Sequence, residues 1–130
     1  MRSLTYRDET ATGRELARHT LPDLPERITV RELLRLRVRE EVARHNAAPG
    51  RHFAGLVQPV DAEVALNGYR LPRKRRLDWH RQADVAEAAF ARNGFFILLN
   101  DRQVEDLEET VDLTGEVDVA FVKLTPLVGG

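Results

Sequence analysis

The chain has 130 residues, 42% of them hydrophobic, so it is long enough to bury a core and is expected to form a single domain. Its 20 Lys and Arg side chains nearly balance its 21 Asp and Glu, and the formal net charge of −1 predicts neither a nucleic-acid partner nor a membrane surface. The chain has no cysteine, which excludes disulfides, thiolate catalysis and Cys-type zinc or iron–sulfur sites.

The N-terminal segment is predicted to form a β-hairpin. Leu4 and Tyr6 alternate with polar residues as in a half-buried strand, and residues 13–20 begin with a turn glycine and supply the return strand. Pro22 and Pro25 then disfavour a continued strand or a helix. The segment lacks the apolar run of a signal peptide, and no segment reaches the roughly 20 apolar residues of a membrane span, so a cytoplasmic protein is expected.

A first helix is predicted over residues 29–46. Thr29, followed three residues later by Glu32, has the spacing of a capping box. One face of the helix is apolar: Val30, Leu33, Leu34, Val38 and Val42. A second face carries three arginines that indicate either an anionic partner or, as is more common, a solvated face: Arg31, Arg35 and Arg39.

Residues 47–76 have a mixed pattern that predicts a short hairpin or a loop, with a tight turn at Asn67-Gly68. Five of the seven residues 70–76 are basic. Such a run is typical of an anion or nucleic-acid contact, but no aromatic residue interrupts it, so an exposed loop is the preferred interpretation.

A second helix is predicted over residues 78–94. Asp78 is placed to cap its N-terminus, and Gly94 stands where a C-terminal residue in the left-handed conformation is expected. The apolar stripe of this helix comprises Trp79, Ala86, Ala89 and Phe90.

The last third is predicted to be β-structure. Residues 95–100 form an apolar run, typical of a strand buried on both faces, and residues 101–113 predict a turn and a charged edge strand. After a turn at residues 114–115, residues 117–124 are apolar on both faces. A strand of this kind is expected in the middle of a sheet.

This order of elements resembles the ubiquitin-like β-grasp family, in which the last strand is central and parallel to the first and a helix crosses one face. Residues 95–130 are most similar to its small sulfur carriers, the small subunit of molybdopterin synthase and the sulfur carrier of thiamine biosynthesis. The similarity lies in three short motifs: Leu99-Asn100 at a strand end, the turn Thr114-Gly115-Glu116-Val117, and the ending Leu127-Val128-Gly129-Gly130.

The resemblance implies an α+β fold: one β-grasp domain over residues 1–130, with a mixed sheet of four to five strands and a main helix. Residues 47–94 would be an insertion that holds the second helix, and residues 125–130 an exposed tail. It also implies that the protein is not an enzyme and has no catalytic side chain, no metal and no bound cofactor.

The resemblance implies that an E1-like enzyme uses ATP to adenylate the carboxylate of Gly130. A sulfur nucleophile then yields a thiocarboxylate, or an amine yields an isopeptide bond. Further partners would be a sulfur-acceptor enzyme, a target protein or a JAB-type protease. Glycine suits a narrow channel on the partner because it has no β-carbon. The implied site residues are Gly129 and Gly130 as the acyl site, Pro126, Leu127 and Val128 as the supporting tail, and Val117, Val119 and Phe121 as a partner face.

Two alternatives remain open. The chain is a non-covalent docking module of the same fold, or, with less support, an enzyme with its own active site. The four histidines lack the spacing of metal ligands: His19, His45, His52 and His80. An acidic run predicts a solvated edge strand more simply than a cation site or a contact for a basic partner: Asp101, Glu105, Asp106, Glu108 and Glu109.

Overall fold

The computed structural model describes residues 2–124. These residues form an α+β structure with two helices and a mixed five-stranded sheet, as the sequence predicts at this level. The described chain divides into two compact units: residues 2–33 with 90–124 (unit 1), and residues 34–89 (unit 2). The predicted insertion, residues 47–94, lies in unit 2 up to Ala89 and in unit 1 beyond it.

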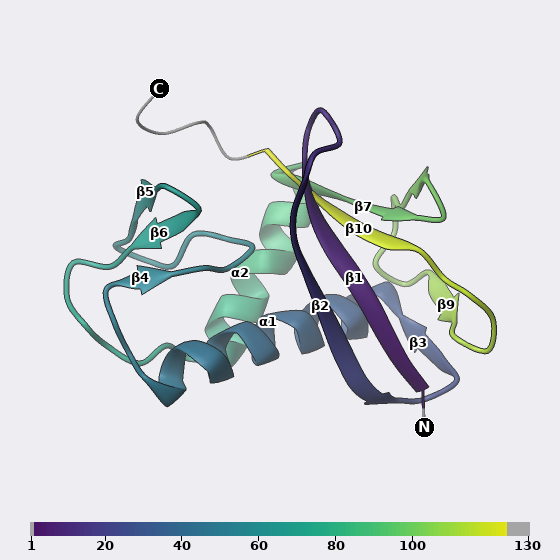
Figure 1. Cartoon of the computed structure of the whole chain (residues 1–130), viewed down its shortest axis with the longest axis horizontal. Coiled ribbons are helices and arrows are strands. Elements are labelled where there is room, and N and C mark those ends of the chain that lie inside the picture. The colour runs from purple at the N-terminus through teal and green to yellow at the C-terminus, as the bar shows by residue number, and fades with distance from the viewer. Residues whose placement is uncertain (1, 125–130) are drawn as a thin grey trace. The chain divides into compact units, whose positions relative to one another are not determined.

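Unit 1 contains the five-stranded sheet, in the order β2-β1-β10-β7-β8 (Figure 1). The strands are β1 (Arg2–Thr10), β2 (Glu15–Leu24), β7 (Phe95–Leu99), β8 (Arg102–Gln103) and β10 (Val119–Lys123). β10 pairs in parallel with β1 and antiparallel with β7. The prediction of a central last strand is therefore confirmed.

The two faces of this sheet differ in burial. One face forms a core of side chains no more than 5% exposed, among them Leu4, Tyr6, Ile97, Leu99, Val119 and Phe121. β7 alternates between buried and half-exposed residues, so the prediction that it is buried on both faces is corrected. The half-exposed residues of β7 are Phe96 and Leu98, on the outer face of the sheet.

β2 runs through Pro22 to Leu24, beyond the break that the prolines predict. The register between β1 and β2 shifts here, from Leu4 opposite Leu21 to Arg2 opposite Leu24, and Asp23 has a φ of 59°. These are the signs of a β-bulge on an edge strand, where proline's missing N–H costs no ladder hydrogen bond. Pro25 follows the strand, as expected.

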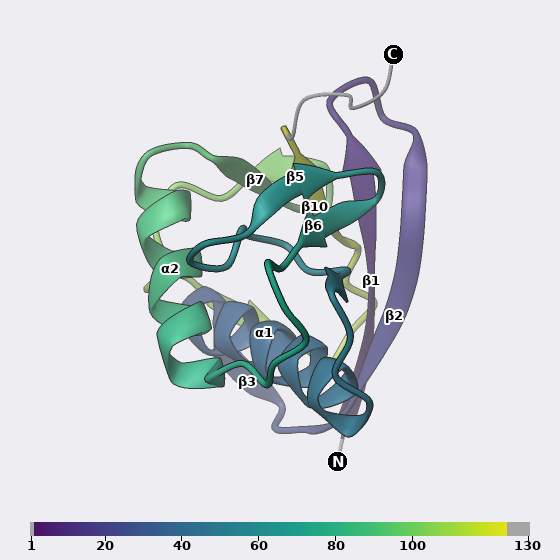
Figure 2. The ribbon, with the colours of Figure 1, turned by 90° about the vertical axis from the view of Figure 1, so that its left-hand side faces the viewer.

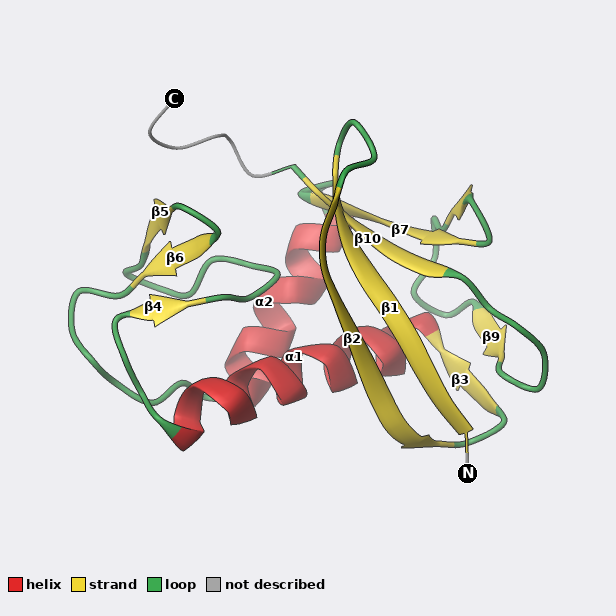
Figure 3. Cartoon of the chain, viewed as in Figure 1, coloured by secondary structure: helices red, strands yellow, loops and turns green. Residues whose placement is uncertain are grey.

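The start of α1 (Val30–Ala47) is bonded to a small second sheet of unit 1, formed by β3 (Arg27–Thr29) and β9 (Thr110–Asp112) (Figure 3). The Val30 and Arg31 amides donate to the carbonyls of Glu109 (2.8 Å) and Leu107 (2.9 Å). The Glu32 amide donates to Thr29 Oγ1 at 3.1 Å, as the capping box predicts. All three amides, which no intrahelical carbonyl can reach, are thus satisfied.

The part of α1 in unit 2 is followed by three short antiparallel strands, labelled in Figure 1, of which Figure 2 shows β5 and β6 side by side. They are β4 (His52–Phe53), β5 (Glu63–Ala65) and β6 (Gly68–Arg70), in the order β4-β6-β5. β5 and β6 form a short hairpin, one of the two predicted alternatives. Its turn residues are Leu66 and Asn67, one position before the predicted Asn67-Gly68, and Asn67 has a φ of 59°. All five residues of the predicted apolar face of α1 are buried.

α2 (Trp79–Ala91) begins as predicted, because the His80 amide donates to Asp78 Oδ1 at 2.9 Å. Its end differs: Asn93, with a φ of 61°, takes the left-handed conformation expected of Gly94. Asparagine tolerates this conformation better than other side chains. Ala86 and Ala89 are buried as predicted, whereas Trp79 and Phe90 are only half-buried. Neither α1 nor α2 is long and apolar enough to cross a membrane.

Candidate functional site

The five residues expected to form the reactive tail lie outside the described residues: Pro126, Leu127, Val128, Gly129 and Gly130. The structure does describe the strand that leads toward them. β10 ends at Lys123, and the next residue, Leu124, is 39% exposed. The candidate site is therefore the surface of unit 1 around β10.

The expected partner face at Val117, Val119 and Phe121 is corrected by the structure. Val119 and Phe121 are 1% and 0% exposed, and Phe121 packs edge-on against Tyr6 with the ring centroids 5.4 Å apart. Only Val117 is half-exposed. Because β10 is apolar on both faces, its sequence alone does not say which face a partner can reach.

The outer face of the sheet carries an apolar strip that sequence reasoning missed. Val122 pairs with Phe96 across β10 and β7, and Ala120 pairs with Leu98. Phe96, Leu98 and Val122 are half-exposed. With the exposed Leu124 they form the apolar strip: Phe96, Leu98, Val122 and Leu124. The signal in the sequence was the second apolar face of the predicted strand 117–124: Ala120, Val122 and Leu124.

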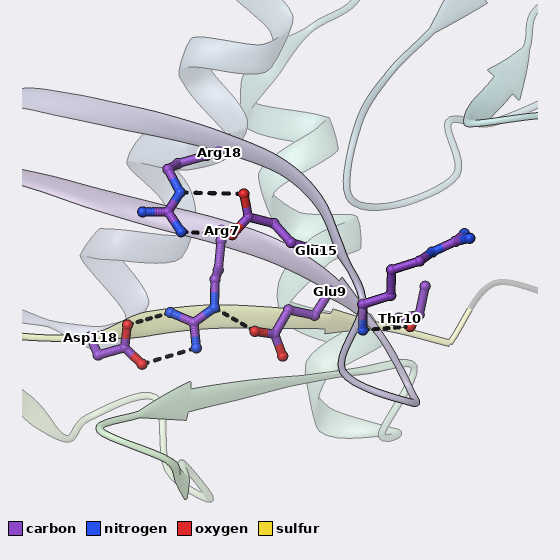
Figure 4. A network of polar contacts seen from close by, with 7 residues as sticks. Arg7, Glu9, Thr10, Glu15, Arg18 and Asp118 are labelled. Atoms are coloured by element: carbon purple, nitrogen blue, oxygen red, sulfur yellow. Dashed lines mark hydrogen bonds and ion pairs between the residues drawn. The ribbon is translucent and has the colours of Figure 1, made fainter.

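Figure 4 shows a charged cluster formed by residues of β1 and β2 and by Asp118, which directly precedes β10. Arg7 is the register partner of Ala120, so its side chain lies on the outer face beside the strip. The guanidinium of Arg7 donates to both carboxylate oxygens of Asp118, one bond being 3.0 Å long, and its Nε donates to Glu9. Arg18, opposite Arg7 on β2, donates to Glu15 at 2.6 Å.

Hydrogen bonding within this cluster shifts the pKa values of its members. The bonds from Arg7 hold the pKa of Asp118 below its usual range, and the bonds to Asp118 and Glu9 raise the pKa of Arg7. The bond between Arg18 and Glu15 lowers the pKa of Glu15 and raises that of Arg18. All four groups therefore remain ionised near neutral pH, and none of them is suited to exchange a proton with a substrate.

An open groove of about 960 Å³ lies beside the charged cluster. The strand β1 lines it together with residues 113–118, and its polar side chains include Ser3, Thr5, Arg18 and Thr114. The described lining residues include no histidine, lysine or cysteine. The groove thus presents hydroxyls and paired charges for polar contacts.

Other candidate groups have structural partners. Two of the five carboxylates of the acidic run form ion pairs: Glu108 with Arg31 at 2.7 Å, and Glu109 with Arg102 at 2.7 Å. His45 Nε2 lies 2.8 Å from the carbonyl of Arg75, and His80 stacks on Trp79. Over residues 2–124, no group of three or more His, Asp or Glu side chains is placed to hold a metal ion.

Comparisons with family models, with curated proteins and with solved structures find no match to this chain.

The ion pair between Arg7 and Asp118 predicts a pH-dependent contribution to stability. Because the pKa of Asp118 is lower in the folded chain than its unfolded value of about 3.9, the ionised carboxylate stabilises the fold above that pH. The contribution is lost as the pH falls through the folded pKa. The Asp118→Asn variant should lose less than about 1 kcal/mol at pH 7, since the carboxylate is half exposed. Urea unfolding of both proteins should converge in strongly acidic solution.

The control for this prediction is the same substitution in an Arg7→Ala background. The cost of Asp118→Asn should there be close to zero at every pH, because the carboxylate has lost the guanidinium that it contacts. An equal cost in both backgrounds would show that the Asp118 carboxylate acts through another charge, such as that of Arg18.

Proposed function

We propose that the chain is a ubiquitin-like β-grasp protein that delivers the carboxylate of Gly130 as an acyl group. The observation that carries the proposal is the strand order β2-β1-β10-β7-β8, with the last strand central and parallel to β1. The β-grasp fold has the same arrangement, with the helix after the first hairpin, where α1 begins. From the end of β10, Gly129-Gly130 follows within seven residues.

The chemistry requires partner enzymes, because the chain has no cysteine of its own. A carboxylate oxygen of Gly130 attacks the α-phosphate of ATP on an E1-like enzyme, and pyrophosphate leaves. Hydrosulfide, or the thiolate of a partner enzyme, then attacks the acyl carbon and displaces AMP. The product is a thiocarboxylate for sulfur transfer, or a thioester that an amine of a target converts into an amide. The protein acts in the cytoplasm as the carrier.

Intact mass spectrometry of the chain isolated from its own cells tests this proposal. We expect a form in which one oxygen is replaced by sulfur, or target proteins with a Gly-Gly remnant on lysine. The same spectrum gives the residue at which the mature chain ends. Recovery of the free acid alone, in the presence of the adenylating enzyme and ATP, would refute the carrier role.

Matched variants make the test specific. Gly129→Ala/Gly130→Ala should abolish the modified form, because the added β-carbons obstruct a channel that fits glycine. Gly50→Ala is the control: Gly50 lies in a loop of unit 2, and a β-carbon there has no heavy atom within 4 Å. The control should be modified as fully as the wild type.

The apolar strip favours a second candidate function, that of a docking module which never reacts. Half-exposed Phe96, Leu98 and Val122 beside a charged cluster form the kind of surface that protein partners bind. Removal of Gly129 and Gly130 separates the two functions. A docking module should keep its partner after this deletion, and a carrier should lose its activity.

A further inference from the structure

Charge is distributed unequally between the two units, although the whole chain is nearly neutral. Residues 34–89 contain eleven Lys and Arg against seven Asp and Glu, a net charge of +4. Residues 1–33 and 90–124 contain nine against fourteen, a net charge of −5. The near-zero net charge of the whole chain predicted no nucleic-acid partner, but it is the sum of an acidic unit 1 and a basic unit 2.

The basic run of unit 2 is held in place by hydrogen bonds. His45 Nε2 lies 2.8 Å from the carbonyl of Arg75, and the Asn46 side chain bonds both the amide (2.8 Å) and the carbonyl (2.9 Å) of Leu77. The guanidinium of Arg75 donates to the carbonyl of Val60 at 2.8 Å. The run is thus attached to the last turns of α1, and its backbone conformation is set before any ligand binds.

Four cations of this run are exposed, and three of them stand close together in the sequence: Arg73, Lys74 and Arg76. No ion pair with a residue in the described part of the chain neutralises them, whereas Arg35 on α1 is paired with Asp84 (3.0 Å) and Glu87 (2.6 Å). The run therefore presents unneutralised positive charge on a fixed backbone.

Trp79, three residues after Arg76, supplies the aromatic group that the run itself lacks. Its ring lies under the guanidinium groups of Arg39 (5.5 Å) and Arg35 (5.8 Å), and the His80 ring lies 3.9 Å away, tilted by 30°. Trp79 is half-buried and Arg39 is exposed, so unit 2 holds planar groups for stacking three residues after the last cation of the run. Unpaired bases stack on aromatic rings and on guanidinium planes, while arginine and lysine bind phosphates.

From this combination we infer that the basic run and Trp79 form a binding site for single-stranded nucleic acid in unit 2. An acidic peptide would pair with the cations but would leave the faces of the Trp79 ring and of the guanidinium groups unused. Double-stranded nucleic acid would leave those planes unused, because its bases are stacked already. The site is independent of the acyl-carrier role and requires no reaction.

The single tryptophan of the chain makes the site directly observable. The full chain is titrated with oligo(U) and oligo(dT) of about 16 nucleotides, and Trp79 fluorescence and the anisotropy of labelled oligonucleotide are recorded. Trp79 fluorescence should change on binding. The slope of log Kobs against log salt should be about −2, for three phosphate contacts on a single strand.

The triple variant Arg73→Ser/Lys74→Ser/Arg76→Ser should bind at least about tenfold more weakly and should show a flatter salt dependence. The matched control, Arg14→Ser/Arg27→Ser/Arg92→Ser, removes the same charge from exposed positions of unit 1 and should bind like the wild type. Trp79→Ala should lose at least about fivefold in affinity, measured by anisotropy, and Trp79→Phe should retain most of it.

Three results would overturn the inference. The first is no binding of either oligonucleotide at low salt. The second is an equal loss in the two triple variants, which would indicate a response to net charge alone. The third is competition by polyglutamate or by a duplex as strong as that by oligo(U), which would identify a general anion surface.

Discussion

Replacing Glu41 with alanine is expected to lower the free energy of unfolding by about 3–5 kcal/mol. Glu41 and Arg37, one turn apart on α1, have side chains that are each only 2% exposed, and Arg37 Nε donates to Glu41 Oε1 at 2.8 Å. Glu41 Oε2 accepts a second bond from the Leu56 amide at 2.7 Å. The variant removes the carboxylate from a buried guanidinium and a buried amide together, which is among the most costly changes in a protein interior.

Urea unfolding followed by circular dichroism measures this cost. Glu40→Ala is the matched control, because Glu40 is the preceding residue of the same helix and is exposed; it should change stability by less than about 0.5 kcal/mol. Glu41→Gln should fall between the two, since its amide oxygen can still accept one of the two bonds. If Glu41→Ala proved as mild as Glu40→Ala, the buried pair would contribute nothing to stability.

Gly55 shows how closely the chain approaches this pair. A β-carbon at Gly55 would lie 2.1 Å from the ring of Phe53 and 2.7 Å from Glu41 Oε2. The loop before Leu56 can therefore reach the carboxylate only with glycine at this position. The loop, the ring and the ion pair form one buried arrangement in unit 2.

Much of the fold follows from local patterns in the sequence. The capping box at Thr29, the helical spacing of Leu33 and Val38, and the two-sided apolar run of β10 each depend on near neighbours in the chain. Local rules of this kind predict helices, strand pairing in the first hairpin and the central place of β10. The structure agrees with them at each of these points.

The differences arise where tertiary context decides. Pro22 is accepted in β2 because that strand is at an edge and bulges there, and neither condition is visible in the residues around Pro22. β3 and β9 have three residues each, too few for any periodicity, and they pair over 80 residues apart. Asn93, and not Gly94, takes the left-handed conformation after α2. Both asparagine and glycine accept this conformation, so the sequence does not decide between them.

The candidate sites depend even more on long-range contacts. Arg7 and Asp118 are 111 residues apart in sequence and meet only because β1 and β10 are parallel neighbours. The contact of Arg39 with Trp79 likewise joins two helices. A sequence pattern identifies such residues as charged or aromatic, but not as partners.

The central position of β10 leads to the second large prediction: Phe121→Ala should lower the free energy of unfolding by about 3–5 kcal/mol. Phe121 is 0% exposed and contacts the rings of Tyr6 on β1 and Phe95 on β7, at centroid distances of 5.4 and 6.4 Å. Its removal would leave a cavity where three strands meet. Chemical unfolding, read by circular dichroism because Trp79 lies in the other unit, measures the loss.

Phe96→Ala provides the comparison, because it removes the same phenyl group from the outer face of the sheet. Phe96 is half-exposed, so the stability cost should be only about 1 kcal/mol. If the apolar strip is a docking surface, this mild variant should nevertheless bind the partner, or the adenylating enzyme, more weakly than the wild type. Phe121→Ala, assayed below its unfolding midpoint, should bind normally, because its side chain faces the core. If Phe121→Ala costs more stability and Phe96→Ala costs more binding, the core face and the binding face of β10 are distinct. If Phe96→Ala weakens binding no more than Phe121→Ala does, the strip binds nothing.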